Sequence, residues 1–306
     1  MNPLLSIQGI TKLYEGKKAV DNVSLTLHKG QIIGLLGPNG AGKTSLIRMI
    51  TSITLPDEGQ IFFKGEPLKV EHQKFIGYMP EERGLYKKMT VLEQLIYLLR
   101  LRGLSYQDAK EKSFEWLKKL YLEDWKDNQV NELSKGMQQK VQFILTVAHD
   151  PELLILDEPF SGLDPLNAQI IENYILELKN QGKTVLFSTH RMEQAENFCE
   201  QIALINQGKL IINDTIFNLK NQFKKNHYLL KTRHQNYKFI SEIPEITVLD
   251  ASEKLVFQLP THYNLKEFFM TILEHDEITH FEEVLPSLSE IFIQLVSKEA
   301  QPLKSF

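Results

Sequence analysis

Short apolar runs and helically spaced apolar residues take turns along the first two thirds of the chain. Residues 32–36, 153–156 and 184–187 are largely apolar runs bounded by polar or turn residues, a pattern typical of strands buried on both faces. Residues 44–53 and much of 87–149 instead place apolar side chains three or four positions apart, which predicts helices. Strands and helices in this order predict an α/β domain with a mainly parallel sheet covered by helices.

The pattern changes at a polar, basic segment, residues 220–226, and we place a domain boundary at residue 222. The first domain then spans residues 1–222, and residues 223–306 contain one strand-like and two helix-like segments. We expect this second part to be a small accessory α+β domain of ordinary size. Its aromatic residues leave two interpretations open: a small hydrophobic core, which their spacing favours, or a ligand-sensing regulatory site. These residues are Tyr263, Phe268, Phe269, Phe281 and Phe292.

Composition narrows the class of protein. The 306 residues include 35 Lys and Arg against 39 Asp and Glu, a formal net charge of −4, so we expect no nucleic-acid partner. No apolar run is long enough for a membrane-spanning helix, and we expect no secretory signal at the N-terminus. The single cysteine, Cys199, excludes an intrachain disulfide and fits a reducing compartment. Any membrane role would be peripheral or through a partner.

A glycine-rich loop follows the first apolar run and opens a helix. Its glycines let several backbone N–H groups point at one phosphate, and the following helix presents its positive end to the same anion. Lys43 would contact the β and γ phosphates, and the hydroxyl of Thr44 would ligate magnesium. The strand before the loop and the helix after it argue against a chance glycine turn. We therefore expect nucleotide binding by Gly37, Pro38, Asn39, Gly40, Ala41, Gly42, Lys43, Thr44 and Ser45.

Two carboxylates follow the second apolar run. Asp157 comes at the tip of a predicted strand, where a magnesium-holding carboxylate is needed beside a phosphate loop. The side chain of Glu158 points differently because strand side chains alternate, and it is placed to polarise a water for attack on the γ-phosphate. The alternative to these two roles is that Asp157 and Glu158 are simply solvated carboxylates at a strand end. The glycine-rich loop in the same chain favours the functional roles.

Three further motifs follow one another along the chain together with the glycine-rich loop and the acidic pair. They are Leu133-Ser134-Lys135-Gly136-Met137 before a helix, Ser161-Gly162-Leu163-Asp164-Pro165 after the acidic pair, and His190 after the third apolar run. Together with the two motifs above, they resemble the nucleotide-binding subunit of an ABC transporter over about residues 4–215. The resemblance implies a P-loop NTPase fold with a mainly parallel sheet, an antiparallel β part and a helical subdomain at about residues 87–149.

The resemblance also implies roles and partners. Tyr14 would stack on adenine, and His190 would contact the γ-phosphate and help to organise the attacking water. Ser134 and Gly136 would contact ATP held by a second subunit, and Asp164 would communicate across that dimer. The implied cofactors are ATP and Mg²⁺. The implied partners are a second copy of the chain and an integral membrane permease, which would hold the protein peripherally at the cytoplasmic face of the membrane.

This sequence departs from the usual family pattern at three positions. Glu81 stands where glutamine is usual, and as an oxygen ligand it would still bind magnesium. Lys135 and Met137 stand where glycine and glutamine are commonest in the signature motif. These departures, and residues 285–296 of the tail, resemble the exporters of the sodium-extrusion and ABC-2 type.

The leading hypothesis is therefore an ATP-hydrolysing motor subunit of an exporter, with the transported substrate left open. The alternative is a soluble ABC ATPase without a permease, acting as a regulatory or assembly factor. Chromosome and repair ATPases of this kind separate the two ATP motifs by a long coiled coil, and Lys43 and Asp157 are too close for one. Translation-associated ABC proteins carry two cassettes in one chain, and this chain has one.

Overall fold

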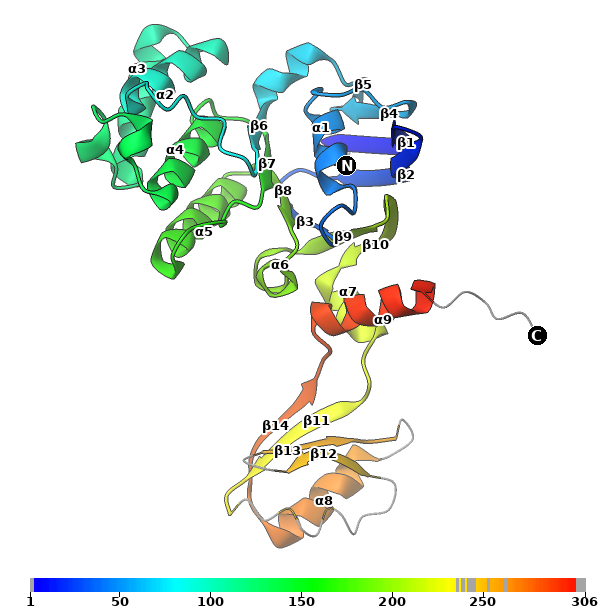
Figure 1. Cartoon of the computed structure of the whole chain (residues 1–306). Coiled ribbons are helices and arrows are strands. Elements are labelled where there is room, and N and C mark those ends of the chain that lie inside the picture. The colour runs from blue at the N-terminus through cyan, green and yellow to red at the C-terminus, as the bar shows by residue number, and fades with distance from the viewer. Residues whose placement is uncertain are drawn as a thin grey trace. The chain divides into compact units, whose positions relative to one another are not determined.

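The computed structural model describes residues 3–234, 237, 240, 246–251, 254–260 and 264–300. The chain forms two compact units, Met1–Thr215 and Ile216–Phe306, which are drawn in Figure 1. The division precedes residue 222, where we placed the boundary, because helix α7 (Ile216–Gln222) packs on α9 (Leu288–Ala300) within the second unit. Among the described residues, no helix is both long and apolar enough to span a membrane.

A six-stranded sheet forms the centre of the first unit. Its order is β10-β9-β3-β8-β7-β6, and every neighbouring pair is parallel except β9 and β10. Every residue of β3, β7 and β8 is buried, as expected for apolar runs covered on both faces. The predicted parallel core is thus confirmed. The strands are β3 (Ile32–Leu36), β6 (Ile76–Met79), β7 (Leu153–Asp157), β8 (Thr184–Thr189), β9 (Gln201–Asn206) and β10 (Lys209–Thr215).

A second, antiparallel sheet lies on the other side of helix α1 (Lys43–Ile50). It consists of β1 (Leu5–Tyr14), β2 (Lys17–Leu27), β4 (Glu58–Phe63) and β5 (Glu66–Pro67), in the order β2-β1-β4-β5. One buried apolar cluster contains Ile47 of α1, Leu25 of this sheet and Leu35 of the central sheet. Burying a side chain of this size stabilises the fold by about 1.5–3 kcal/mol, so this core fixes the start of α1 against both sheets.

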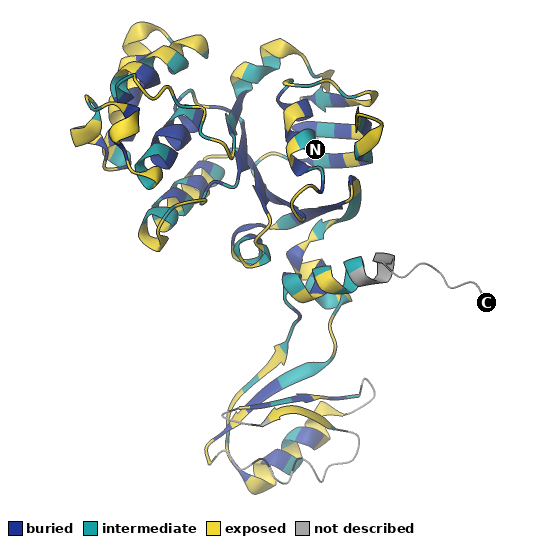
Figure 2. Cartoon of the chain, in the orientation of Figure 1, coloured by how far each residue is buried: buried dark blue, intermediate teal, exposed yellow. Residues whose placement is uncertain are grey.

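Helices α2 (Val91–Leu101), α3 (Tyr106–Lys119) and α4 (Lys135–Val147) form the helical region expected at 87–149. The helices α5 (Pro165–Asn180) and α6 (Met192–Phe198) and three 3-10 turns (Val70–Phe75, Glu123–Trp125, Val130–Glu132) complete the first unit. Each of α2 to α5 begins at a side chain that accepts a backbone N–H of the first turn, namely Thr90, Ser105, Ser134 and Asp164. Such N-caps satisfy N–H groups that have no partner inside the helix. The helices turn their buried faces inward and their exposed faces to solvent (Figure 2).

The second unit is a small α+β domain. Its antiparallel sheet has the order β12-β13-β11-β14, and α8 (Leu265–His275) packs on it through Phe268 and Ile272. Phe257 and Phe268 lie 4.9 Å apart between ring centres. Phe268 is buried in this core, and the partly buried Phe269 and Phe281 pack against it, which supports the structural interpretation of these three aromatic residues. Phe292 lies on α9 (Leu288–Ala300), apart from this core, and Tyr263 lies outside the described residues. The strands are β11 (His227–Thr232), β12 (Thr247–Ala251), β13 (Leu255–Gln258) and β14 (Ile278–Val284).

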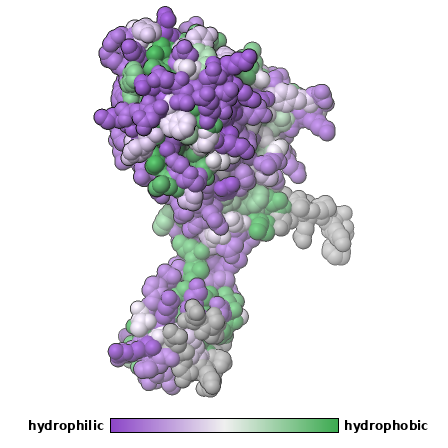
Figure 3. All heavy atoms as spheres, turned by 60° about the vertical axis from the view of Figure 1, so that its left-hand side comes forward, coloured by the Kyte–Doolittle hydropathy of each residue, from purple (hydrophilic) through white to green (hydrophobic). Residues whose placement is uncertain are grey.

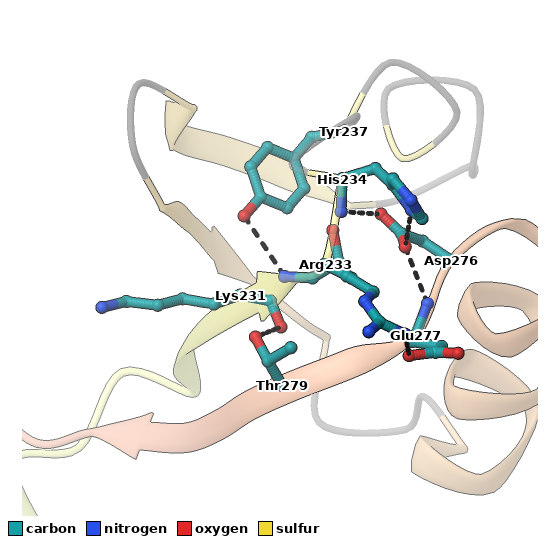
Figure 4. Close-up of polar contacts among 8 residues, drawn as sticks. Lys231, Arg233, His234, Tyr237, Asp276, Glu277 and Thr279 are labelled. Atoms are coloured by element: carbon teal, nitrogen blue, oxygen red, sulfur yellow. Dashed lines mark hydrogen bonds and ion pairs between the residues drawn. The ribbon is translucent and has the colours of Figure 1, made fainter.

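A buried carboxylate joins two segments of this second unit (Figure 4). The Asp276 side chain, 2% exposed, accepts the backbone N–H of His234 at 3.0 Å and that of Glu277 at 2.8 Å. The Nδ1 atom of His234 lies 2.9 Å from the same carboxylate. Burial alone would raise the pKa of Asp276, but these hydrogen bonds outweigh burial and lower it. Asp276 thus ties the end of β11 to the turn between α8 and β14.

Candidate nucleotide-binding site

A pocket of about 290 Å³ lies at the edge of the central sheet where β3 and β7 end. The carboxyl ends of parallel strands meet at one edge, where open α/β sheets bind their ligands. Four separate segments contribute its walls: the glycine-rich loop with the start of α1, strand β2, the loop after β6 and the end of β7. The lining residues are Ala19, Asn39, Gly40, Ala41, Gly42, Lys43, Thr44, Ser45, Glu81, Asp157 and Glu158.

The glycine-rich loop is held closely by neighbouring backbone. At Gly37, an added Cβ would lie 2.1 Å from the carbonyl oxygen of Ile205, and at Gly42 it would lie 2.2 Å from that of Ala19. Gly42 precedes α1 with φ +109°, a conformation that L side chains rarely adopt. Glycine at these positions therefore lets the loop close against β2 and β9 and directs the start of α1 into the pocket.

Lys43 lies folded against the loop that precedes it. Its Nζ donates to the carbonyl oxygens of Gly37 at 2.7 Å and Pro38 at 3.1 Å, and the residue is 8% exposed. Burial lowers the pKa of Lys43, while the nearby carboxylates, of which Glu158 acts most strongly, oppose the shift. Lys43 thus places a positive charge in the pocket. A negatively charged ligand bound there would displace water and pair with it.

Three carboxylate side chains, Glu81, Asp157 and Glu158, line the pocket together with the glycine-rich loop. Asp157 is 2% exposed, and burial raises its pKa, with further contributions from the charges of Glu81 and Glu158. Asp157, Glu81 and the hydroxyl of Thr44 line one pocket. Two carboxylates with a hydroxyl are the oxygen donors that Mg²⁺ takes together with phosphate oxygens and water. The described residues contain no cluster of three or more His, Cys, Asp or Glu able to hold a metal.

Glu158 and His190, both expected to be catalytic, are in direct contact. The Nδ1 atom of His190 lies 2.6 Å from Glu158 Oε1, and the backbone N–H of His190 donates to the same oxygen at 2.9 Å. The hydroxyl of Thr189 donates to the other carboxylate oxygen at 3.3 Å. Glu158 adopts φ +50°, a left-handed conformation that costs roughly 1–3 kcal/mol for a residue with a Cβ. This turn aims the Glu158 carboxylate into the pocket and toward His190.

Tyr14 does not line this pocket. It lies at the end of β1, 40% exposed, opposite Lys17 on β2, and the Nζ of Lys12 lies 5.7 Å from its ring centre. Its stacking on adenine stays a prediction. The structure instead adds Ala19 of β2 to the pocket wall, and no sequence motif marks this residue.

The three remaining predicted residues gather in a second pocket of about 550 Å³, which shares no lining residue with the first. Ser134 caps α4 by accepting the N–H of Met137 at 3.2 Å, and Asp164 caps α5 by accepting that of Asn167 at 2.9 Å. Hydrogen bonds from Asn167 lower the pKa of Asp164. An added Cβ at Gly136 would make only an ordinary contact at 3.5 Å, so packing within the chain does not require glycine there. One chain therefore presents two separate surfaces for the residues expected to bind one nucleotide.

A third hollow, of about 370 Å³, lies between α2, α4 and the loop after β6. Its walls are mainly apolar, and beside it the exposed rings of Tyr86 and Tyr97 pack edge to face at 6.2 Å. Figure 3, which brings the helical region forward, shows apolar side chains in small patches among hydrophilic ones. The lining residues are Tyr78, Pro80, Gly84, Leu85, Leu98, Leu101, Arg102, Gln142, Leu145 and Thr146.

Comparisons with known proteins agree with this geometry. Residues 20–161 match the family model "ABC transporter", and residues 215–296 match "ATP-binding protein DrrA1-3-like, C-terminal domain". The chain is 40% identical over 294 residues to the uncharacterized ABC transporter ATP-binding protein YhaQ of Bacillus subtilis, covering 96% of this chain and 98% of YhaQ. It is 34% identical to the lipopolysaccharide export system ATP-binding protein LptB of Haemophilus influenzae, covering 69% and 90% of the two chains. Among solved structures, a dimeric ATP-binding cassette in a post-hydrolysis state, bound to ADP and Pi, matches with a TM-score of 0.64 and 25% identity, covering 69% and 98%.

Proposed function

This chain belongs to the family of ABC transporter ATP-binding proteins, and we propose that it is the motor subunit of an exporter. ATP hydrolysis is the characteristic activity of the family. The observation that carries the proposal is the division of the nucleotide residues between two pockets of one chain. The relative whose name includes an export system supports the direction of transport.

Within the first pocket, positioning and charge would account for hydrolysis. The loop N–H groups and Lys43 would hold the phosphates, as in other P-loop NTPases. Mg²⁺ held by Thr44, Glu81 and Asp157 would supply positive charge to the β and γ phosphates. Glu158, oriented by His190 at 2.6 Å, would accept a hydrogen bond from the attacking water and align it with the γ-phosphate.

The second pocket would be completed by another copy of the chain. Ser134, Gly136 and the N-terminal end of α4 would meet the γ-phosphate held in the partner's first pocket, since a helix start with free N–H groups attracts an anion. ATP would then bind the closed dimer more tightly than the open one and shift the population toward closure. Hydrolysis would remove the γ-phosphate contacts and let the dimer reopen. The dimeric relative bound to ADP and Pi supports this arrangement.

The apolar hollow between α2, α4 and the loop after β6 is the surface that we propose for the membrane permease. It includes Pro80 and Leu85 on either side of the loop that carries Glu81, so an element bound there would lie next to the nucleotide site. This would place the protein peripherally at the cytoplasmic face of the membrane. The permease, and not this chain, would select the substrate.

Glu158→Gln tests the catalytic assignment. The amide keeps the size of the side chain but cannot accept the water's proton, so the variant should bind ATP, form a stable dimer with ATP and lose at least about 100-fold in turnover. Glu177→Gln, an exposed carboxylate on α5, is the matched control and should keep wild-type turnover. Turnover by Glu158→Gln within twofold of the wild type would remove Glu158 from catalysis.

The export assignment is tested with a candidate permease, chosen as a membrane protein encoded near this chain. Both would be purified together, placed in vesicles with the ATPase outside, and supplied with ATP. Accumulation of a compound inside the vesicles, abolished by Glu158→Gln, is the expected result for an exporter. Failure to isolate any membrane partner, together with full ATPase activity of the chain alone, would favour an ABC ATPase without a permease.

A further inference from the structure

A buried glutamine on α4 joins two loops that contribute to the nucleotide pocket. Gln139 is 1% exposed, and both ends of its amide are used. Its Oε1 accepts a hydrogen bond from Nε of Arg83 at 3.2 Å, and its Nε2 donates to the carbonyl oxygen of Pro159 at 3.0 Å. Arg83 follows Glu81 in the loop after β6, and Pro159 follows Glu158 directly.

A second glutamine strengthens the same junction one turn later on α4. Gln142, 4% exposed, donates from Nε2 to the carbonyl oxygen of Pro80 at 2.7 Å. The Arg83 guanidinium also lies against the loop before α5, with its Nη2 3.0 Å from where a Cβ on Gly162 would stand. Three residues of the loop carrying Glu81, namely Pro80, Glu82 and Arg83, are thus held by side chains of α4.

The helix that makes these bonds also begins at the second pocket. Ser134 and Gly136 stand at the N-terminal end of α4, and Gln139 lies only one turn farther along the same rigid helix. Buried hydrogen bonds are costly to leave unmade. A small movement of α4 would therefore carry the Glu81 loop and the Glu158 loop with it, because water cannot replace the broken bonds.

We propose that Gln139, together with Arg83, is a positioning residue for ATP hydrolysis. When the nucleotide of a second subunit contacts Ser134 at the start of α4, Gln139 passes the resulting shift of the helix to two loops. The positions of Glu81 and Glu158 in this chain's own pocket then change with it. The inference rests on the proposed function, in which Ser134 contacts that nucleotide. Gln139 touches neither nucleotide nor metal site, since it lines neither pocket.

The test compares three methionine variants of similar side-chain length. Gln139→Met removes both bonds of the bridge, and Arg83→Met removes only the bond to the loop after β6. Gln138→Met is the matched control, because the Gln138 amide donates to Val130 and Leu133 within the helical region and bridges neither loop. ATPase rates are measured against ATP concentration, with thermal unfolding as a check on folding.

Gln139→Met should lower kcat about tenfold and raise KM for ATP no more than about fivefold, since misplaced groups near the reacting atoms slow the chemical step. Arg83→Met should lower kcat by a smaller factor, and the double variant should be no worse than Gln139→Met, because both changes break one network. Gln138→Met should keep wild-type kcat. Equal losses in Gln138→Met and Gln139→Met, or multiplying losses in the double variant, would overturn the proposal.

A second measurement separates this inference from the proposed function. In the Glu158→Gln background, ATP-dependent dimer formation is followed by light scattering, with and without Gln139→Met. The proposal expects the second change to raise the ATP concentration needed for dimerisation at least threefold. If Glu158→Gln dimerises with ATP and Gln139→Met leaves that concentration unchanged, the bridge does not couple the two pockets. If Glu158→Gln never dimerises, the proposed function fails instead.

Discussion

Gly42→Ala probes how closely the phosphate loop must approach its neighbours. The added Cβ would lie 2.2 Å from the carbonyl oxygen of Ala19, in a residue with φ +109°. Gly65→Ala is the control, because Gly65 has φ +84° and nothing within 4 Å of an added Cβ. Both variants impose an unfavourable backbone conformation, and only Gly42→Ala also creates a clash with backbone.

The expected sizes of the two effects follow from this geometry. The backbone conformation costs roughly 1–3 kcal/mol in each variant, which a domain stable by about 5–15 kcal/mol survives. In Gly42→Ala, the Cβ and the Ala19 oxygen must also separate by about 1.2 Å to reach an ordinary contact of 3.4 Å. The loop or β2 has to shift by that amount, and a displacement of about 1 Å costs about 100-fold in rate.

Steady-state ATPase assays and thermal unfolding of the two full-length variants test this reasoning. Both proteins should fold with modestly lowered melting temperatures. Gly65→Ala should keep kcat/KM within about twofold of the wild type, whereas Gly42→Ala should lose about 100-fold. Activity of folded Gly42→Ala within threefold of the wild type would refute the claim that this close approach sets the geometry of the phosphate loop.

Two further predictions concern stability. The pKa of Asp276 is lowered on folding, so its ionised form stabilises the second unit fully above the unfolded pKa of about 3.9, and this contribution is lost as the pH falls from there toward the lower pKa of the folded state. Asp276→Asn should lower the melting temperature of the second unit at pH 7 and flatten its acid dependence, measured by calorimetry on the full chain; an unchanged acid dependence would contradict this. Thr90 caps α2 in a reciprocal arrangement with Glu93, and Thr90→Ala should cost about 1 kcal/mol in denaturant unfolding while Thr90→Ser restores most of it.

The central sheet could be predicted from the sequence because its strands are buried on both faces. Such strands appear as uninterrupted apolar runs, and the runs at 32–36, 153–156 and 184–187 became β3, β7 and β8. The start of a helix could also be predicted where a serine precedes a helical pattern of apolar residues, as at Ser134 before α4. Local chemistry decides these features, so neighbouring residues are enough to reveal them.

Other parts of the site depend on contacts between distant segments. Arg83 and Gln139 lie 56 positions apart, and Gln139 and Pro159 lie 20 apart, so no local pattern marks the bridge. The place of Ala19 in the pocket follows from how β2 passes beside the phosphate loop. The separation of Ser134 and Asp164 from Lys43 likewise follows from tertiary packing, and the motifs alone give no distance between them.

The second pocket contains residues whose identity a single chain explains only in part. N-capping accounts for a hydroxyl at Ser134 and a carboxylate at Asp164. It does not account for both helix starts facing one hollow, nor for Gly136, where a side chain would fit without a clash. Packing within the chain does not require glycine at position 136. The missing side chain would instead let another molecule approach the backbone closely. In a dimer of two such chains, the N-terminal end of α4 of each chain would lie opposite Lys43 of the other. Each nucleotide site would then be completed by one pocket of each kind.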